Sequence, residues 1–297
     1  MVPMPSPAPP PPPLTPADLA PADARSAGFD FAGFSMATID APGHPWFERV
    51  YTTLSDEFGP AGEMEQRDVI AARMAWGLND PGDGYAMQYT LLTLLCGDAI
   101  AAVHDHSTIV PLRDAAAPVV VHLSHAWVAP PWRGTGLAGW VRALPVRDAR
   151  AVVVQSSPPG QPMIRPITLV AEMEPADPAS AARTRRLRAY EKAGYRKIDP
   201  LAVAYRQPDF RPPAVIDATG GPRPVPLSLI VRRIGREDQT HVDGDEVRAI
   251  IAALRAMYAR TARPADMAAL AADPLPAATA RIALVPPTSG SSPSGGG

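Results

Sequence analysis

A glycine-rich stretch near the middle of the chain has the composition of a phosphate-binding loop. It reads RGTGLAG from Arg133 to Gly139, and its glycines spell G-x-G-x-x-G. The strand-like run PVVVHLSHAWV precedes it and the helix-like run LAGWVRAL overlaps its end. Backbone N–H groups at the start of a helix have no partners within the helix, and the helix dipole favours an anion there. The pattern therefore predicts a phosphate site.

The flanking residues decide between two kinds of phosphate ligand. A dinucleotide site needs its first glycine at the end of the strand and an acidic residue about 20 positions later. Here Pro-Pro-Trp-Arg intervenes, and Gln155 stands where the acid is expected. No Gly-Lys-Ser/Thr follows, as a P-loop would require. Residues 133–138 also read R-x-x-G-x-A, the spelling of a loop that binds the pyrophosphate of an acyl-CoA. This second interpretation fits its context better.

Two motifs in order resemble one known family. AWVAPPWRGTGLAGWV resembles motif A of the GNAT superfamily of acyl-CoA-dependent N-acetyltransferases. About 60 residues later, LRAYEKAGYRKID resembles motif B, with YEKAGY at 190–195. The resemblance spans roughly Trp46 to Ile234. It implies an α+β fold of three layers, in which helices flank a mixed central sheet, and acetyl-CoA as the co-substrate, with no metal.

The resemblance also implies which residues bind acetyl-CoA. The backbone of the motif A loop is expected to surround the pyrophosphate, and the strand before it is expected to pair with the pantetheine arm. The implied cofactor-binding residues are Ala126, Trp127, Val128, Arg133, Gly134, Thr135, Gly136, Leu137 and Ala138. The structural alternative is a plain glycine-rich helix start.

Three residues are candidates for catalysis. Acetylation needs a neutral amine, so a base must accept its proton. In the family a Glu or His often lies eleven residues before the motif A Arg, and here that residue is His122, with Ser124 on the same face by strand alternation. Tyr190 occupies the motif B position of the acid that protonates the departing thiolate. Glu172 is the next candidate base. Each has a structural alternative: a hydrogen-bonded core histidine, an interior tyrosine, or an exposed polar face shared with Glu174.

Other reactive side chains are weaker candidates. His104 and His106 share a face, but two ligands do not make a metal site. His125 is expected to point away from His122 and to pack beside Trp127. The single cysteine, Cys96, is expected at a hairpin turn, so a covalent acyl carrier is not favoured. The basic helix at 182–188 is read as a solvated face, although one arginine could reach the 3′-phosphate of CoA.

Composition limits the classes of partner. The chain of 297 residues has a formal net charge of −2, which gives no reason to expect nucleic acid or an anionic membrane as a partner. One cysteine excludes an internal disulfide framework and fits the reducing cytoplasm. We expect a monomer or homodimer without a membrane span.

The pattern of apolar residues predicts interleaved helices and strands. Helices are expected in HPWFERVYTTLSDEF and EMEQRDVIAARMAWG, then a hairpin turning at 96–98, the strand before the loop, and Pro145 ending the motif A helix. The stretch 145–166 is expected to be an insertion, either a surface loop or a cover for the cleft. The whole chain is expected to divide into four segments: a flexible Pro-rich tail at 1–40, the acetyltransferase domain at 41–236, a helical extension at 237–282 and a disordered tail at 283–297.

The sequence thus predicts an N-acetyltransferase that moves acetyl directly from acetyl-CoA to the amine of a small molecule. Two alternatives remain: a non-catalytic acyl-CoA-binding module, and a protein-lysine acetyltransferase.

Overall fold

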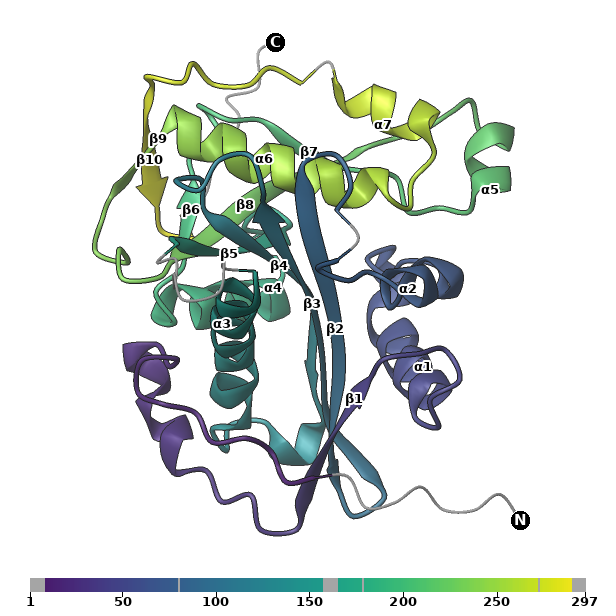
Figure 1. Ribbon diagram of the computed structural model, residues 1–297, viewed down its shortest axis with the longest axis vertical. Coiled ribbons are helices and arrows are strands. Elements are labelled where there is room, and N and C mark those ends of the chain that lie inside the picture. Colours follow the sequence, from purple (N-terminus) through teal and green to yellow (C-terminus); the bar gives the residue numbers. More distant parts are fainter. Residues whose placement is uncertain (1–8, 80, 157–164, 178, 272, 290–297) are drawn as a thin grey trace.

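A mixed β-sheet forms the centre of the molecule (Figure 1). The computed structural model describes residues 9–79, 81–156, 165–177, 179–271 and 273–289. Within them the strands are β1 (Phe34–Ile39), β2 (Tyr85–Cys96), β3 (Ala99–Pro111), β4 (Val119–Val128), β5 (Ile167–Met173), β6 (Arg196–Ile198), β7 (Tyr205–Gln207), β8 (Val225–Arg233), β9 (His241–Asp243) and β10 (Arg281–Val285). They are ordered β1-β2-β3-β4-β5-β8-β6-β10-β9, with β7 also paired to β8. Only β4 and β5 pair in parallel among these strands.

Helices cover both faces of the sheet and make it the middle of three layers. The helices are α1 (Phe47–Phe58), α2 (Arg67–Arg73), α3 (Leu137–Gln155), α4 (Ala181–Lys192), α5 (Pro213–Ala218), α6 (Gly244–Ala259) and α7 (Pro264–Ala271), with 3-10 turns η1 (Pro21–Gly28), η2 (Gly59–Ala61) and η3 (Pro130–Trp132). One face packs against α1, α2 and α6, and the other against α3 and α4. The predicted fold class is confirmed.

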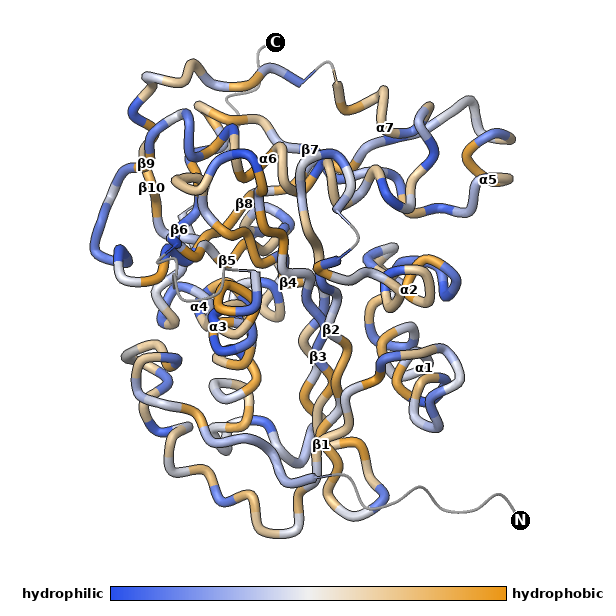
Figure 2. The backbone as a smooth tube through the Cα atoms, viewed as in Figure 1, coloured by the Kyte–Doolittle hydropathy of each residue, from blue (hydrophilic) through white to orange (hydrophobic). Residues whose placement is uncertain are grey.

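Strand β4 shows how the sequence builds this arrangement. Its Val119, Val121 and Leu123 pack in the cluster beneath α3 and α4, whereas Val120 packs in the cluster beneath α6. Alternation along a strand sends successive side chains to opposite faces, so VVVHL buries both sides and places His122 toward α6. Figure 2 shows apolar stretches along the central strands β4, β5 and β8.

The predicted hairpin is confirmed, since β2 pairs antiparallel with β3. The prediction of a flexible tail at 1–40 is wrong in part. Strand β1 pairs antiparallel with β2 from Phe34↔Cys96 to Ile39↔Leu91. Turn η1 packs on α3, where Arg142 forms an ion pair of 2.6 Å with Asp23. Prolines dominate only the first part of this segment, and the aromatic and polar residues after them have partners in the fold.

Helix α3 continues through Pro145, contrary to the prediction that it ends there. Proline removes one backbone hydrogen bond, but it does not prevent a helix whose inner face is firmly packed. Beyond Pro145 that face is formed by Val146, Ala149 and Val152, which are buried in the core beneath the sheet. The insertion at 145–166 is therefore helical up to Gln155; residues 157–164 of it lie outside the described residues.

The C-terminal segments are also more closely integrated than predicted. The extension at 237–282 contains α6 and α7 but also β9, which pairs with β10. Strand β10 lies across the predicted start of the disordered tail and pairs with β6 at Leu284↔Ile198. These strands extend the same sheet, so residues up to Val285 belong to the folded unit.

Candidate active site

The parallel strands β4 and β5 separate at the centre of the sheet. Their pairing runs from Val119↔Ile167 to Leu123↔Ala171 and stops there, although β4 continues to Val128. A cavity of about 150 Å³ lies at the point of separation. Its lining includes the predicted His122, Ala126, Glu172 and Tyr190, together with the outer carboxylates Glu63 and Glu174.

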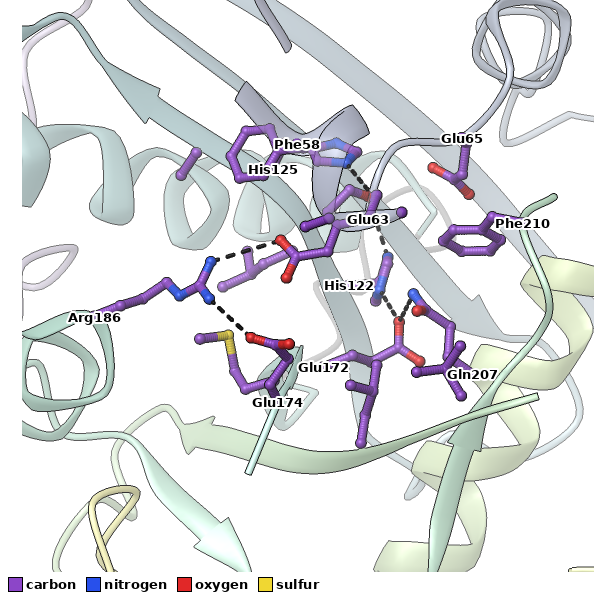
Figure 3. Close-up of a pocket in the computed structure, with 18 of the residues that line it drawn as sticks. Phe58, Glu63, Glu65, His122, His125, Glu172, Glu174, Arg186, Gln207 and Phe210 are labelled. Atoms are coloured by element: carbon purple, nitrogen blue, oxygen red, sulfur yellow. Dashed lines mark hydrogen bonds and ion pairs between the residues drawn. The ribbon is translucent and has the colours of Figure 1, made fainter. Parts of the chain in front are cut away.

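A buried hydrogen-bond network centred on Glu172 forms the floor of the cleft (Figure 3). His122 Nε2 lies 2.8 Å from Glu172 Oε2, and the two side chains are 4% and 3% exposed. Tyr205 donates to the other carboxylate oxygen, and Tyr258 and Gln207 donate to the same oxygen as His122. Four donors thus converge on one carboxylate from β4, β7 and α6.

This network keeps the Glu172 carboxyl ionised. Burial alone would raise its pKa, but hydrogen bonds from His122, Tyr205 and Tyr258 outweigh burial and hold the pKa below its ordinary value. An ionised carboxylate only accepts hydrogen bonds, so His122 Nε2 carries a proton and Nδ1 is left as the acceptor. The arrangement matches that of a base oriented by a carboxylate.

Tyr190 lies on the other wall of the cleft, near the end of α4. Its ring packs edge-to-face on Tyr195, with centroids 5.0 Å apart. Burial raises the pKa of its phenol despite the opposing charges of Arg142 and Arg186. The phenol therefore keeps its proton at neutral pH, as a general acid must.

The loop at 133–138 lies at the amino end of α3, and none of its residues is among those that line the described cleft. Gly134 (φ 80°) and Gly136 (φ 104°) have left-handed backbones that glycine tolerates best. Residues 133–135 are exposed, and no atom of the described residues lies within 4 Å of where a Gly134 Cβ would be. The loop therefore has the backbone and the open space that a phosphate group needs.

The third glycine of the G-x-G-x-x-G pattern has a packing role. A Cβ on Gly139 would lie 2.3 Å from Ser26 Oγ and 2.8 Å from Asp23 Oδ1, both in η1. Ser26 also donates a 2.7 Å hydrogen bond to the carbonyl of Gly136. Gly139 thus allows η1 to approach α3, which explains why a dinucleotide-like spacing appears here.

Two of the predicted cofactor residues have partners within the chain. Arg133 Nε donates to the carbonyl of Val128 at 2.8 Å, so the guanidinium folds back over the end of β4. Trp127 Nε1 donates to Glu57 of α1 at 3.2 Å. Of the three residues predicted to pair with the pantetheine arm, Ala126 is the one that lines the described cleft.

Glu174 and Glu172 have different environments, although the sequence places them on one face. Glu174 is about one-third exposed and pairs with Arg183 at 2.6 Å and Arg186 at 3.5 Å. Arg186 also pairs with Glu63 at 3.6 Å across the mouth of the cleft. The outer carboxylates are therefore compensated by arginines, whereas Glu172 is held by neutral donors and His122.

His125 lies on the same face as His122, which corrects the prediction that it points to the opposite face. The register between β3 and β4 shifts between Asp105↔His125 and His106↔Leu123, so Ser124 is an extra residue that resets the alternation. His125 Nδ1 lies 3.0 Å from the buried Asp105. Burial alone would lower the pKa of His125, but the Asp105 carboxylate outweighs burial and raises the pKa to about 9.

This ion pair makes the stability of the fold depend on pH above neutrality. The pKa of His125 is higher in the folded chain than the ~6.5 of a free histidine, so its contribution is complete below about pH 6.5 and is lost as the pH rises through 9. We expect the free energy of unfolding to fall by about 3 kcal/mol over that range. Urea unfolding of wild type and His125→Gln over this pH range measures the change in the free energy of unfolding.

The His125→Gln variant should be less stable than wild type at pH 6.5 and should lack most of the slope. His241→Gln, a partly exposed control, should keep the slope. An unchanged slope in His125→Gln would assign the pH dependence to another group.

His104 and His106 lie on the α3 face and are buried. Their rings stack with centroids 5.2 Å apart, and His104 Nδ1 contacts the carbonyl of His125 at 2.9 Å. Burial lowers the pKa of His104 to about 4. Among the described residues no group of three or more His, Cys, Asp or Glu side chains is placed to hold a metal ion.

Three residues of the network were not predicted from the sequence. Tyr205 and Gln207 are two positions apart on a strand, and this spacing alone could have placed both on one face. Tyr258 lies on α6, within the predicted helical extension, and was not singled out as a site residue. It lies 136 residues from His122 in the chain, yet its hydroxyl is 3.5 Å from the imidazole.

The comparisons with known proteins found similarity to solved structures, and none in sequence. No protein-family model and no curated protein matches the sequence. A GNAT-family acetyltransferase of Bacteroides thetaiotaomicron is similar in structure, at 16% identity and TM-score 0.38, over 66% of this chain and 85% of that one. An acetyltransferase of Streptococcus agalactiae (14%, TM-score 0.40) and a GNAT-family acetyltransferase of Desulfovibrio desulfuricans (16%, TM-score 0.37) each match over 68% of this chain and 99% of their own.

These three solved structures are acetyltransferases. In the described part of the chain, no helix is long and apolar enough to cross a membrane.

Proposed function

We propose that the protein is a GNAT-type N-acetyltransferase that transfers acetyl from acetyl-CoA directly to the amine of a small molecule. The observation that carries this proposal is the separation of β4 from β5 after Leu123↔Ala171. A thioester arm laid along the freed edge of β4 would pair with its backbone like an added strand. Its acyl end would then enter the cleft beside His122 and Tyr190, and its pyrophosphate would lie at the start of α3.

The residues divide the reaction between the two walls of the cleft. His122, oriented by Glu172, accepts the proton of the attacking amine. Tyr190 donates a proton to the sulfur as the carbon–sulfur bond breaks. The amides of 134–138 and the helix dipole hold the pyrophosphate and so place the thioester. No thiol lines the described cleft, which favours direct transfer over an acyl-cysteine carrier.

The first test is whether amines cause acetyl-CoA to release its thiol. We expect at least one class of small amines to raise the release of free thiol by the wild-type protein. Tight binding of CoA with no release for any amine class would favour a non-catalytic acyl-CoA-binding module. Release with peptide lysines and with no small amine would favour a protein-lysine acetyltransferase.

A second prediction tests the loop by charge alone. Gly136 is a poor site for an added charge, because its φ of 104° strains any other residue. Ala138, in the first turn of α3, is better: Ala138→Glu adds a carboxylate where phosphate is expected, while an acidic residue in a first helical turn stabilises the fold by about 0.3–1 kcal/mol. We expect the CoA-dependent rise in melting temperature to disappear in this variant.

Ala138→Gln has the same size without the charge and should keep part of the rise. NAD serves as the negative ligand for all three proteins. A rise with NAD, or an equal rise with CoA in Ala138→Glu and wild type, would contradict the assignment of this loop.

A further inference from the structure

The β-bulge in β4 places a hydroxyl in the cleft, next to the base. Ser124 has no partner on β3, because Asp105 pairs with His125 and His106 pairs with Leu123. Bulges re-aim side chains, and they are common beside active sites. Ser124 is partly buried and lines the cleft, and its Oγ lies 3.3 Å from His122 Nδ1.

The imidazole itself is nearly closed off from the cleft. His122 is only 3% exposed, and Nε2 is occupied by Glu172, with the Tyr258 hydroxyl 3.5 Å away. The nitrogen free to accept a proton is therefore Nδ1, and the group in front of Nδ1 is the Ser124 hydroxyl. Both residues line the cleft, but Ser124 is the more exposed of the two.

We propose that Ser124 relays the proton from the acceptor amine to His122, which makes the base a Ser–His–Glu chain. This inference rests on the proposed acetyl transfer. As the amine nitrogen bonds to the thioester carbon, its proton passes to Ser124 Oγ while the Ser124 proton passes to His122 Nδ1. Glu172 then stabilises the imidazolium. The intermediate collapses with cleavage of the carbon–sulfur bond, and the sulfur takes a proton from Tyr190. His122 then releases its proton to water, and Tyr190 regains a proton from water.

The hydroxyl can be tested with a matched pair of variants. Thr and Val have nearly the same shape, so Ser124→Thr and Ser124→Val differ mainly in the hydroxyl. We expect Ser124→Val and Ser124→Ala to lower kcat roughly ten- to a hundredfold, at or below the usual range for general acid–base help because water can partly replace the hydroxyl. Ser124→Thr should recover most of the rate, and the KM for acetyl-CoA should not change in any of the three variants. Ser55→Ala on α1 serves as the control.

A double-mutant cycle separates a relay from a merely structural serine. If Ser124 acts only through His122, Ser124→Ala combined with His122→Gln should be no slower than His122→Gln alone. Effects that multiply in the double variant would overturn the relay. Equal rates for Ser124→Thr and Ser124→Val would do the same.

The same constellation could instead attack the thioester and form an acetyl-serine. Intact mass measured after incubation with acetyl-CoA in the absence of amine distinguishes the two. Wild type should show no added acetyl group; an acetyl group present in wild type and absent from Ser124→Ala would replace the relay with a covalent intermediate. If wild type releases no thiol with any amine, the proposed function itself has failed, which is a result separate from any Ser124 variant.

Discussion

A His122→Gln enzyme should turn over roughly 10²–10⁴ times more slowly than wild type, the usual range for removal of a general base. Gln retains a hydrogen-bonding group beside Glu172 but cannot accept and release the proton of the amine. The acidic limb of the pH–rate profile should flatten in this variant, because the ring that accepts the proton is gone. Steady-state kinetics from pH 5 to 9 measures both effects.

Glu172→Gln is the companion variant. It keeps the shape of the side chain and removes the charge that four donors share, so His122 loses the group that fixes its tautomer and stabilises its imidazolium. We expect a smaller loss of rate than in His122→Gln. A His122→Gln enzyme with the wild-type rate and an unchanged acidic limb would show that the base lies elsewhere.

Local sequence patterns predicted the part of the site that depends on one strand and one loop. His122 stands between Val121 and Leu123 on one strand, so strand geometry alone places it on the face opposite to theirs. The motif A spelling placed the loop at the start of α3, where the structure has it. Glu172 was predicted as the next candidate base on a strand face shared with Glu174, and its contact with His122 required the neighbouring strand to be known.

The parts that local pattern could not predict depend on register and on distant elements. Ser124 has neither the glycine nor the proline that usually marks an irregular strand, so nothing in LSHAW signals a bulge. One extra residue moves every later side chain to the other face, and for this reason His125 was placed wrongly. The role of Tyr258 depends on α6 folding back over the sheet, and the role of Gly139 depends on η1.

A Tyr190→Phe enzyme should also lose roughly 10²–10⁴-fold in turnover, while CoA still raises its melting temperature as in wild type. The substitution keeps the ring that packs on Tyr195 and removes only the hydroxyl. Departure of the thiolate without a proton donor is the costly step. The loss of turnover should therefore be smaller for acetyl thioesters whose thiols have a lower pKa.

Tyr195→Phe is the matched control, since the two rings touch but only Tyr190 lines the cleft. Among the described residues the buried Tyr195 hydroxyl has no hydrogen-bond partner, so its removal should leave turnover unchanged and stability equal or higher. Equal turnover in wild type and both variants would return Tyr190 to a packing role. A Tyr190→Phe loss that stays the same for every leaving group would show that its hydroxyl positions the substrate and does not donate the proton, because a general acid matters most for the poorest leaving group.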